Sequence, residues 1–140
     1  MDLPRFQRWV PWSERYDIRD SEKAGVYLLG RFAAPPPEGV EPLSESVIYI
    51  GETCDQTLAK RWYQFNRSAF EQKPGHSGGW TFSARYCGNC PVKPVGWLYV
   101  APLPVTLDEP HRSAFIRHVE RRLIWEYVQK FNALPPCNSK

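Results

Sequence analysis

The sequence predicts a single α/β domain covering residues 1–140. Two short apolar segments, residues 25–29 and 47–52, are rich in β-branched and aromatic residues and predict buried strands. Two longer segments, residues 58–70 and 109–131, repeat apolar residues at three- and four-residue steps and predict amphipathic helices. A chain of 140 residues is long enough to bury one core of its own, which supports a single domain.

The composition limits the class of protein. The net charge of +3 is mildly basic, which is compatible with nucleic acid but does not require it. No apolar run approaches the ~20 residues needed to span a bilayer, and the N-terminus lacks the apolar region of a signal peptide. We therefore expect a cytoplasmic protein with no membrane partner. Its oligomeric state is not indicated.

Residues 1–23 form an N-terminal arm without a clear period. The arm mixes aromatic residues such as Trp9, Trp12 and Tyr16 with four arginines. We expect an irregular segment that packs its aromatic rings on the sheet and exposes its arginines. Such interleaving can bind nucleic acid by stacking and phosphate contact, although surface arginines beside packed aromatics are the commoner arrangement.

A proline-rich loop, residues 31–46, separates the two predicted strands. It contains three consecutive prolines and Pro42, and a chain without free amides cannot continue a sheet, so the loop is predicted to be exposed. Periodicity alone favours a hairpin with a long loop, in which Tyr27 and Tyr49 are core residues.

The first helix is predicted over residues 58–70, with Asp55 or Thr57 as its N-cap. Arg61 falls on the border of its apolar face, where an arginine commonly lays its stem over the edge of the core. His76 follows in a glycine-rich turn, where a lone histidine is usually solvated.

Two further strands are predicted after this turn. Residues 80–86 alternate in polarity, and residues 95–100 are flanked by Pro94 and Pro102, which should mark the strand ends.

The second helix is predicted from about residue 109, capped by Thr106 or Asp108. Glu120 stands four residues after Ile116 and four before Ile124, so its carboxylate lies within the apolar face. Such a charge is costly unless it is paired or binds a metal. If the carboxylate is paired, its partner would be an arginine such as Arg61, Arg117 or Arg121.

These residues together resemble the GIY-YIG nuclease superfamily over roughly residues 25–138. The matching positions are Gly25-Val26-Tyr27 and Tyr49-Ile50-Gly51 for the two motifs, Arg61, His76-Ser77, Glu120 within residues 119–124, and Asn138 after Pro135-Pro136-Cys137.

The resemblance implies an α/β (α+β) fold with a small, mainly antiparallel sheet flanked by helices. It also implies a metal-dependent endonuclease that hydrolyses phosphodiester bonds in duplex or branched DNA. Glu120 would hold one Mg²⁺ or Mn²⁺ ion, and Arg61 would stabilise the phosphate. A tyrosine hydroxyl would orient and deprotonate the attacking water.

The remaining matched residues have supporting roles in this interpretation. Asn138 would pin the site by hydrogen bonds, and His76 would contact phosphate or assist proton transfer. Substrate contacts are expected from Gly51, Lys60 and Arg67.

Two features depart from the family pattern. The distance along the chain from Tyr27 to Tyr49 is about twice the usual one, so residues 31–46 are an insertion. Position 52 is glutamate where many members have lysine, so the cation that activates a tyrosine is either Lys60, Arg61 or the metal, or it is missing. The catalytic tyrosine stays open between Tyr27 and Tyr49, and the better-preserved second motif favours Tyr49.

The cysteines allow two interpretations. Cys87 and Cys90 have the spacing of half a zinc site, and Cys54 and Cys137 would come close if both motif ends meet at the active site. We prefer four reduced thiols to a structural Zn²⁺ ion on Cys87 and Cys90.

Two functions compete with the nuclease. One is a catalytically inactive nucleic-acid-binding module on the same fold, favoured by Glu52 and the basic arm. The other is a partner-recognition domain that uses the proline-rich loop and the arm.

Overall fold

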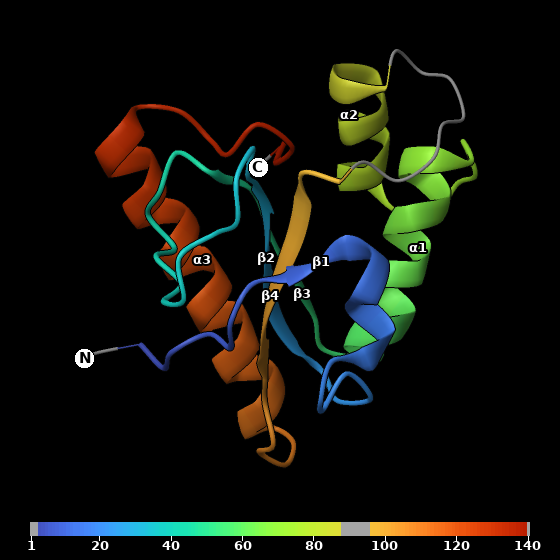
Figure 1. Cartoon of the computed structure of the whole chain (residues 1–140). Helices are drawn as coiled ribbons and strands as arrows, with labels where there is room; N and C mark the ends of the chain where they lie inside the picture. The colour runs from blue at the N-terminus through green and yellow to red at the C-terminus, as the bar shows by residue number, and fades with distance from the viewer. Residues whose placement is uncertain (1–2, 88–95, 140) are drawn as a thin grey trace.

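The computed structural model of the chain describes residues 3–87 and 96–139. Four antiparallel strands form one sheet in the order β1-β4-β2-β3, with helices on both faces (Figure 1). The elements are β1 (Val10–Pro11), the 3-10 helix η1 (Trp12–Asp17), β2 (Gly25–Arg31), β3 (Val47–Thr53), α1 (Leu58–Phe70), α2 (Ser77–Tyr86), β4 (Leu98–Pro104) and α3 (His111–Phe131). This architecture confirms the predicted α+β class with a small antiparallel sheet. In the described part of the chain, none of the helices has the length and apolarity needed to cross a bilayer.

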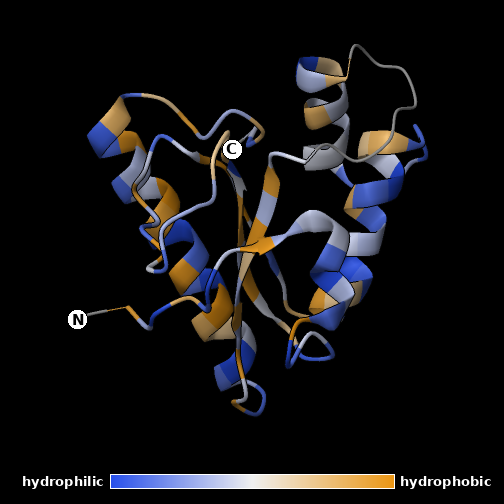
Figure 2. Ribbon diagram, viewed as in Figure 1, coloured by the Kyte–Doolittle hydropathy of each residue, from blue (hydrophilic) through white to orange (hydrophobic). Residues whose placement is uncertain are grey.

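Two hydrophobic clusters hold the layers together, one on each face of the sheet. Val26 and Leu28 of β2 pack against α3, while Tyr27 and Leu29 pack against α1 and α2. This alternation is the period of a strand, whose successive side chains point to opposite faces. Figure 2 shows the apolar surfaces of the helices turned toward the sheet. The central strand β2 is therefore buried on both sides, as the sequence predicts for residues 25–29.

The outer edge of β3 is covered by the C-terminal tail. The Cys137 amide donates to the Ile48 carbonyl at 2.8 Å. The Asn138 side chain accepts from the Ile50 amide and donates to the Ile50 carbonyl, both at 2.9 Å. Unpaired edge groups are a liability in any sheet, and the tail satisfies those of Ile48 and Ile50.

The two amphipathic helices agree with their predicted ranges, but only one predicted cap is correct. Thr57 accepts a hydrogen bond from the Lys60 amide and is the N-cap of α1. Neither Thr106 nor Asp108 caps α3, because Pro110 occupies the N-cap position without a side-chain cap bond. The Glu109 carboxylate instead accepts from the Ser113 amide at 2.8 Å, which satisfies one of the free amides of the first turn.

The predicted strand over residues 80–86 is wrong, because these residues belong to α2. His76 caps α2, and a glycine at position 79 lets the helix approach α1 closely: a Cβ there would lie 2.8 Å from the Phe65 carbonyl oxygen. Phe82 is fully buried against Phe65 of α1, with ring centroids 5.5 Å apart. Packing against a neighbouring helix therefore overrides the alternating pattern.

The predicted strand over residues 95–100 is correct in kind but wrong in extent. β4 continues to Pro104 and includes Pro102, which pairs with Tyr27. The Pro102 carbonyl accepts from the Gln7 amide on the side away from β2, so its nitrogen also faces that outer side and costs no bond to β2. Val95 lies outside the described residues.

The N-terminal arm is more ordered than predicted. Trp9 and Trp12 are buried as expected, but Tyr16 is 51% exposed and Arg15 is buried. The Arg15 guanidinium lies 4.5 Å from the Trp12 ring centroid and donates to the Trp12 carbonyl. The proline-rich loop is exposed or half-buried along its length, as predicted.

Candidate functional site

Tyr27 and Tyr49 meet over a glycine on neighbouring strands. Tyr27 pairs across the sheet with Gly51, and Tyr49 lies two residues before Gly51 on the same face. The two ring centroids are 5.9 Å apart. A Cβ at position 51 would collide with both rings and lie 2.6 Å from Cζ of Tyr27. Glycine is therefore required at position 51 for the two tyrosines to occupy this place together.

His76 supports the buried end of this tyrosine pair. Its Nδ1 accepts a hydrogen bond from the Gly79 amide at 3.1 Å, and its Nε2 lies 2.9 Å from Oη of Tyr27. A neutral imidazole has one donor and one acceptor nitrogen. Because Nδ1 accepts, Nε2 carries the proton and donates it to the Tyr27 oxygen.

His76 is also held neutral. Its side chain is only 2% exposed, and burial followed by the charge of Arg61 lowers its pKa to about 3. The sequence-based interpretation of a solvated loop histidine is therefore wrong. The backbone amide of His76 donates to Oγ of Ser68, so the residue is fixed from both sides.

Arg61 keeps a positive charge without a carboxylate partner among the described residues. Its Nη1 donates to Oε1 of Gln64 at 2.9 Å and to the Gly75 carbonyl at 3.2 Å. Both acceptors are neutral, so they orient the guanidinium without compensating its charge. A half-buried arginine in this state is suited to bind an anion.

Glu120 is the corresponding uncompensated negative charge. It is half-buried on α3, and within the described ranges it forms no ion pair with Arg61, Arg117 or Arg121. Burial, and then the charge of Glu52, raise the pKa of Glu120 to about 7. The alternative that Glu120 is a structural ion pair is therefore wrong. By contrast, Glu126 on the same helix pairs with Arg122 at 3.4 Å.

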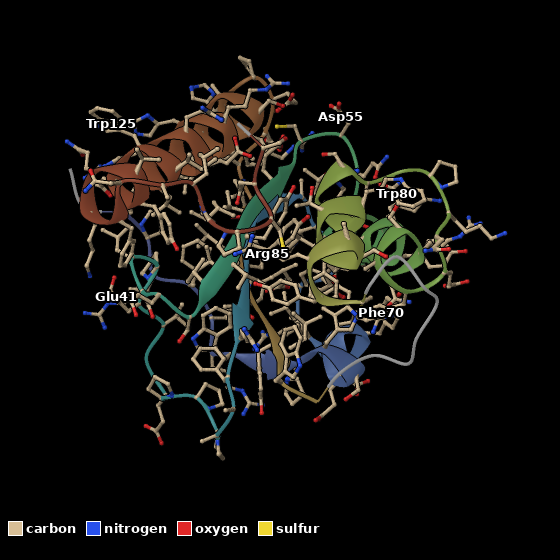
Figure 3. The ribbon with its side chains drawn as sticks, turned by 90° about the horizontal axis from the view of Figure 1, so that it is seen from above. Glu41, Asp55, Phe70, Trp80, Arg85 and Trp125 are labelled. Atoms are coloured by element: carbon tan, nitrogen blue, oxygen red, sulfur yellow. The ribbon has the colours of Figure 1, made fainter. Side chains whose placement is uncertain are left out.

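The charges of Glu120, Glu52 and Arg61 act on both tyrosines, although α3 lies on the opposite face of the sheet. Burial raises the pKa of Tyr49 to about 12, Arg61 lowers it, and Glu120 and Glu52 raise it further. The pKa of Tyr27 is raised by burial and is affected by the same three charges. Tyr49 and Glu52 lie on β3, an edge strand of the sheet. Figure 3 shows this arrangement from above, with β3 between α3 and the α1–α2 pair.

Arg61 and Glu52 line a small cavity of about 180 Å³. Arg61 from α1 and Arg117 from α3 contribute positive charge to its lining, and Glu52 from β3 and Asp55 contribute negative charge. The cavity is completed by Thr53, Cys54 and Gln56. It places two cationic side chains from different helices around one polar space.

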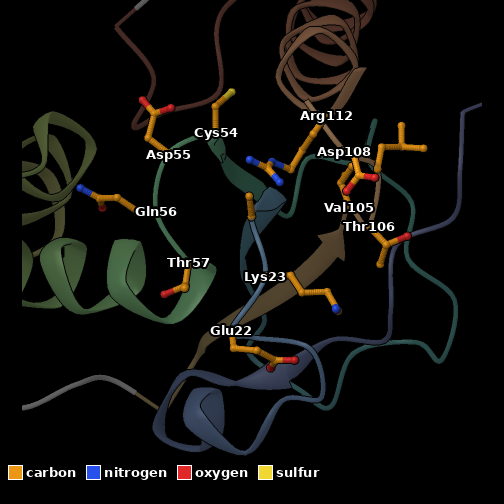
Figure 4. Close-up of a pocket in the computed structure, with 12 residues that line it drawn as sticks. Glu22, Lys23, Cys54, Asp55, Gln56, Thr57, Val105, Thr106, Asp108 and Arg112 are labelled. Carbon is orange, nitrogen blue, oxygen red and sulfur yellow. The ribbon is translucent and has the colours of Figure 1, made fainter. Parts of the chain in front are cut away.

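A larger neighbouring pocket of about 410 Å³ shares residues 54–56 with this cavity (Figure 4). Lys23 and Arg112 contribute positive charge to its lining. Its lining also contains the carboxylates Glu22, Asp55 and Asp108. None of the six predicted catalytic residues lines it, whereas Arg61 lines the smaller cavity. We therefore place the candidate site at the smaller cavity.

The other predicted site residues lie around this centre in different roles. Asn138 uses its amide to hold the backbone of Ile50. Lys60 is exposed on the outer face of α1, and Arg67 lies on the same helix with its guanidinium 5.7 Å from the Tyr63 ring centroid. The structure thus places Tyr27, Tyr49 and His76 in contact, with Arg61 and Glu120 near enough to affect the pKa of both tyrosines and with Asn138 on the outer edge of β3.

The cysteines do not form a common site. Cys54 belongs to the cluster under α3, whereas Cys137 belongs to the cluster on the opposite face, so the predicted proximity of these two thiols is wrong. In residues 3–87 and 96–139, no group of three metal-binding side chains is found. Cys90 lies outside the described residues, so the zinc alternative on Cys87 and Cys90 stays a prediction.

One contact in the site was not predicted from the sequence. The Cys54 thiol donates to the Glu52 carboxylate at 3.2 Å, and burial together with this bond raises the pKa of Cys54 to about 11. The thiol therefore stays protonated and fixes the Glu52 side chain beside the cavity. The spacing of two residues in an extended segment was the available signal, because such residues share a face.

The comparisons with known proteins do not assign a family. No family model matches the chain, and the searches of curated proteins and of solved structures both find no significant match.

Proposed function

We propose that this protein is a metal-dependent endonuclease of the GIY-YIG type that hydrolyses phosphodiester bonds in DNA. One observation carries the proposal. The half-buried Glu120 carboxylate has no ion-pair partner among the described residues and interacts electrostatically with the buried Tyr27 and the half-buried Tyr49. A charge in that position is stabilised when a cation binds.

The donor set fits a single hard divalent cation. Glu120 would hold Mg²⁺ or Mn²⁺ through its carboxylate, with the negative charge of Glu52 nearby. Mg²⁺ retains several of its water ligands and needs only one or two protein carboxylates. When bound, the ion would stabilise negative charge on the phosphate and on the leaving oxygen.

Arg61 would bind the phosphate from the other side. Its guanidinium is oriented by Gln64 and Gly75 and has no carboxylate partner among the described residues. A planar fork of this kind can donate to two phosphate oxygens at once. Arg61 would therefore stabilise the additional charge that develops when water attacks phosphorus.

The exposure of the two tyrosines favours Tyr49 as the one that orients the attacking water. Tyr27 is fully buried, and its oxygen already accepts the His76 proton, whereas Tyr49 is half-buried. As a phenolate, Tyr49 would accept a proton from water while the water oxygen bonds to phosphorus and the leaving oxygen departs. Tyr27 and His76 would act as positioning residues that hold the Tyr49 ring.

A plasmid-nicking assay with Mg²⁺ tests the proposal. We expect Glu120→Gln, which keeps the shape and removes the charge, to reduce nicking at least ~100-fold, because it would remove the metal ligand. The matched control is Glu126→Gln, which removes a carboxylate from the same helix and should leave nicking near the wild-type rate. Equal nicking by wild type and Glu120→Gln would contradict the proposal.

A second function is favoured by one observation. Position 52 is glutamate, and the pKa of Tyr49 is raised to about 12, which makes a phenolate rare at neutral pH. The fold would then serve as a nucleic-acid-binding module without catalysis. Binding that survives EDTA, with no turnover on duplex, branched or single-stranded DNA, would support this alternative.

A further inference from the structure

The outer face of α3 carries three exposed side chains in one line. Arg117, Arg121 and Trp125 are spaced four residues apart, and all three are exposed, with Trp125 at 61%. At a rise of about 1.5 Å per residue, neighbouring members are about 6 Å apart along the helix. We call these three residues the α3 stripe. Figure 3 shows Trp125 projecting from the outer side of α3, away from the sheet.

The arginines of the stripe differ from the other arginines of α3. Arg112 pairs with Glu109 at 3.6 Å, and Arg122 pairs with Glu126 at 3.4 Å. Arg117 and Arg121 form no ion pair within the described parts of the chain. Their charges are therefore free to bind an external anion.

Trp125 is equally without a partner in the described structure. It makes no ring contact and no cation–π contact with another described residue, although most other tryptophans of the chain do so. An indole ring with an open face can stack on a nucleic-acid base, and such stacking is tolerant of sequence. This stacking requires a base that is not already paired and stacked within a duplex.

The stripe begins at the candidate site. Arg117 lines the small cavity together with Arg61 and Glu52, and Arg121 follows Glu120 directly in the sequence. A strand whose phosphate lies at the site would therefore continue along the stripe. With about 12 Å from Arg117 to Trp125, and one phosphate per ~3.4 Å of axis in each strand of a duplex, the stripe spans a few nucleotides.

We propose that the α3 stripe binds a single-stranded segment of the DNA substrate next to the cleavage site. Arg117 and Arg121 hold successive phosphates, and Trp125 stacks on an unpaired base. The inference rests on the proposed function and names its substrate class: a duplex that carries a single-stranded extension or branch, in preference to a blunt duplex.

Binding of two fluorescent DNA probes to the full-length chain tests the inference, with EDTA present to prevent cleavage. One probe is a short blunt duplex, and the other is the same duplex with a single-stranded extension. We expect wild type to bind the extended probe at least ~5-fold more tightly, as stacking of one base predicts. Trp125→Ala should remove this difference, and the matched control Tyr16→Ala, which deletes another exposed ring, should retain it.

The arginines are tested by salt dependence. Arg117→Ala combined with Arg121→Ala should reduce the slope of log K against log salt for the extended probe by about 1.4 to 1.8, because each lost phosphate contact accounts for ~0.7 to 0.9. The control Arg112→Ala removes an arginine that is already paired, so its slope should stay near that of wild type.

Two results would overturn the inference. One is equal affinity of wild type for both probes, and the other is a Trp125→Ala variant that keeps the full preference. If wild type nicks plasmid but shows no preference, only the inference on the stripe fails. If wild type neither nicks nor binds DNA, the proposed function itself fails.

Discussion

On the α1–α2 face of the sheet, every polar atom of His76 has a hydrogen-bond partner, whereas on the α3 face the Glu120 carboxylate has none among the described residues. Both residues are buried or half-buried, so both pay for desolvation. Burial lowers the pKa of His76 to about 3 and raises that of Glu120 to about 7, which keeps the histidine neutral and makes the carboxylate easy to neutralise. The polar groups of His76 are therefore satisfied within the protein, whereas the Glu120 carboxylate is available to a ligand.

The largest effect is expected for His76, whose protonation makes the free energy of unfolding depend on pH. The unfolded chain binds a proton at His76 below about pH 6.5, whereas the folded chain does so only near pH 3. Stability from this residue is therefore present above pH 6.5 and is lost as the pH falls toward 3, by up to about 4 kcal/mol.

Urea unfolding of wild type and His76→Asn as a function of pH measures this loss. Asparagine can still cap α2 but cannot titrate, so the variant should show a flatter dependence between pH 6.5 and 3. The control His118→Asn, which removes an exposed histidine, should keep the wild-type dependence. Parallel curves for wild type and His76→Asn would show that His76 is not buried as described.

The next largest effect is expected at Gly51, over which Tyr27 and Tyr49 pack. Gly51→Ala would place a methyl group against both rings, so we expect it to reduce the free energy of unfolding by about 3 kcal/mol. The control Gly39→Ala adds the same group where no atom lies within 4 Å, and it should change stability little. A tolerated Gly51→Ala would contradict the packing of Tyr27 and Tyr49 over position 51.

A smaller effect is expected at the covered edge of β3. Asn138→Ala removes two hydrogen bonds to the Ile50 backbone and should cost about 1 to 2 kcal/mol. Hydrogen exchange at the Ile50 amide should become faster in this variant. The exposed neighbour Ser139→Ala is the control, and unchanged protection of Ile50 in Asn138→Ala would show that the tail is not held by this side chain.

The sequence allowed much of the fold to be predicted, because α1, α3 and the first two strands have strong apolar periodicity. The assignment failed for residues 80–86, where a glycine-permitted contact between α1 and α2 determines the structure. It also failed at Pro102, because the side on which a strand nitrogen points cannot be known before the sheet order. The position of Glu120, a carboxylate within the apolar face of a helix, could be recognised from the sequence pattern alone.

The proximity of the site residues to one another could not be predicted from apolar periodicity. Tyr49 and Glu120 belong to opposite faces of the sheet, yet the charge of Glu120 raises the pKa of Tyr49. The tautomer of His76 likewise depends on the Gly79 amide, a contact that requires the helix that was predicted as a strand.

Calorimetric titration with Mn²⁺ tests most directly whether the open carboxylate on the α3 face binds a metal. We expect wild type to bind one ion at about pH 8 and to bind it more weakly as the pH falls below 7, because Glu120 becomes protonated there. Glu120→Gln should lose this binding, and Glu126→Gln should retain it. Binding of Mn²⁺ by Glu120→Gln with the affinity of wild type would contradict the account.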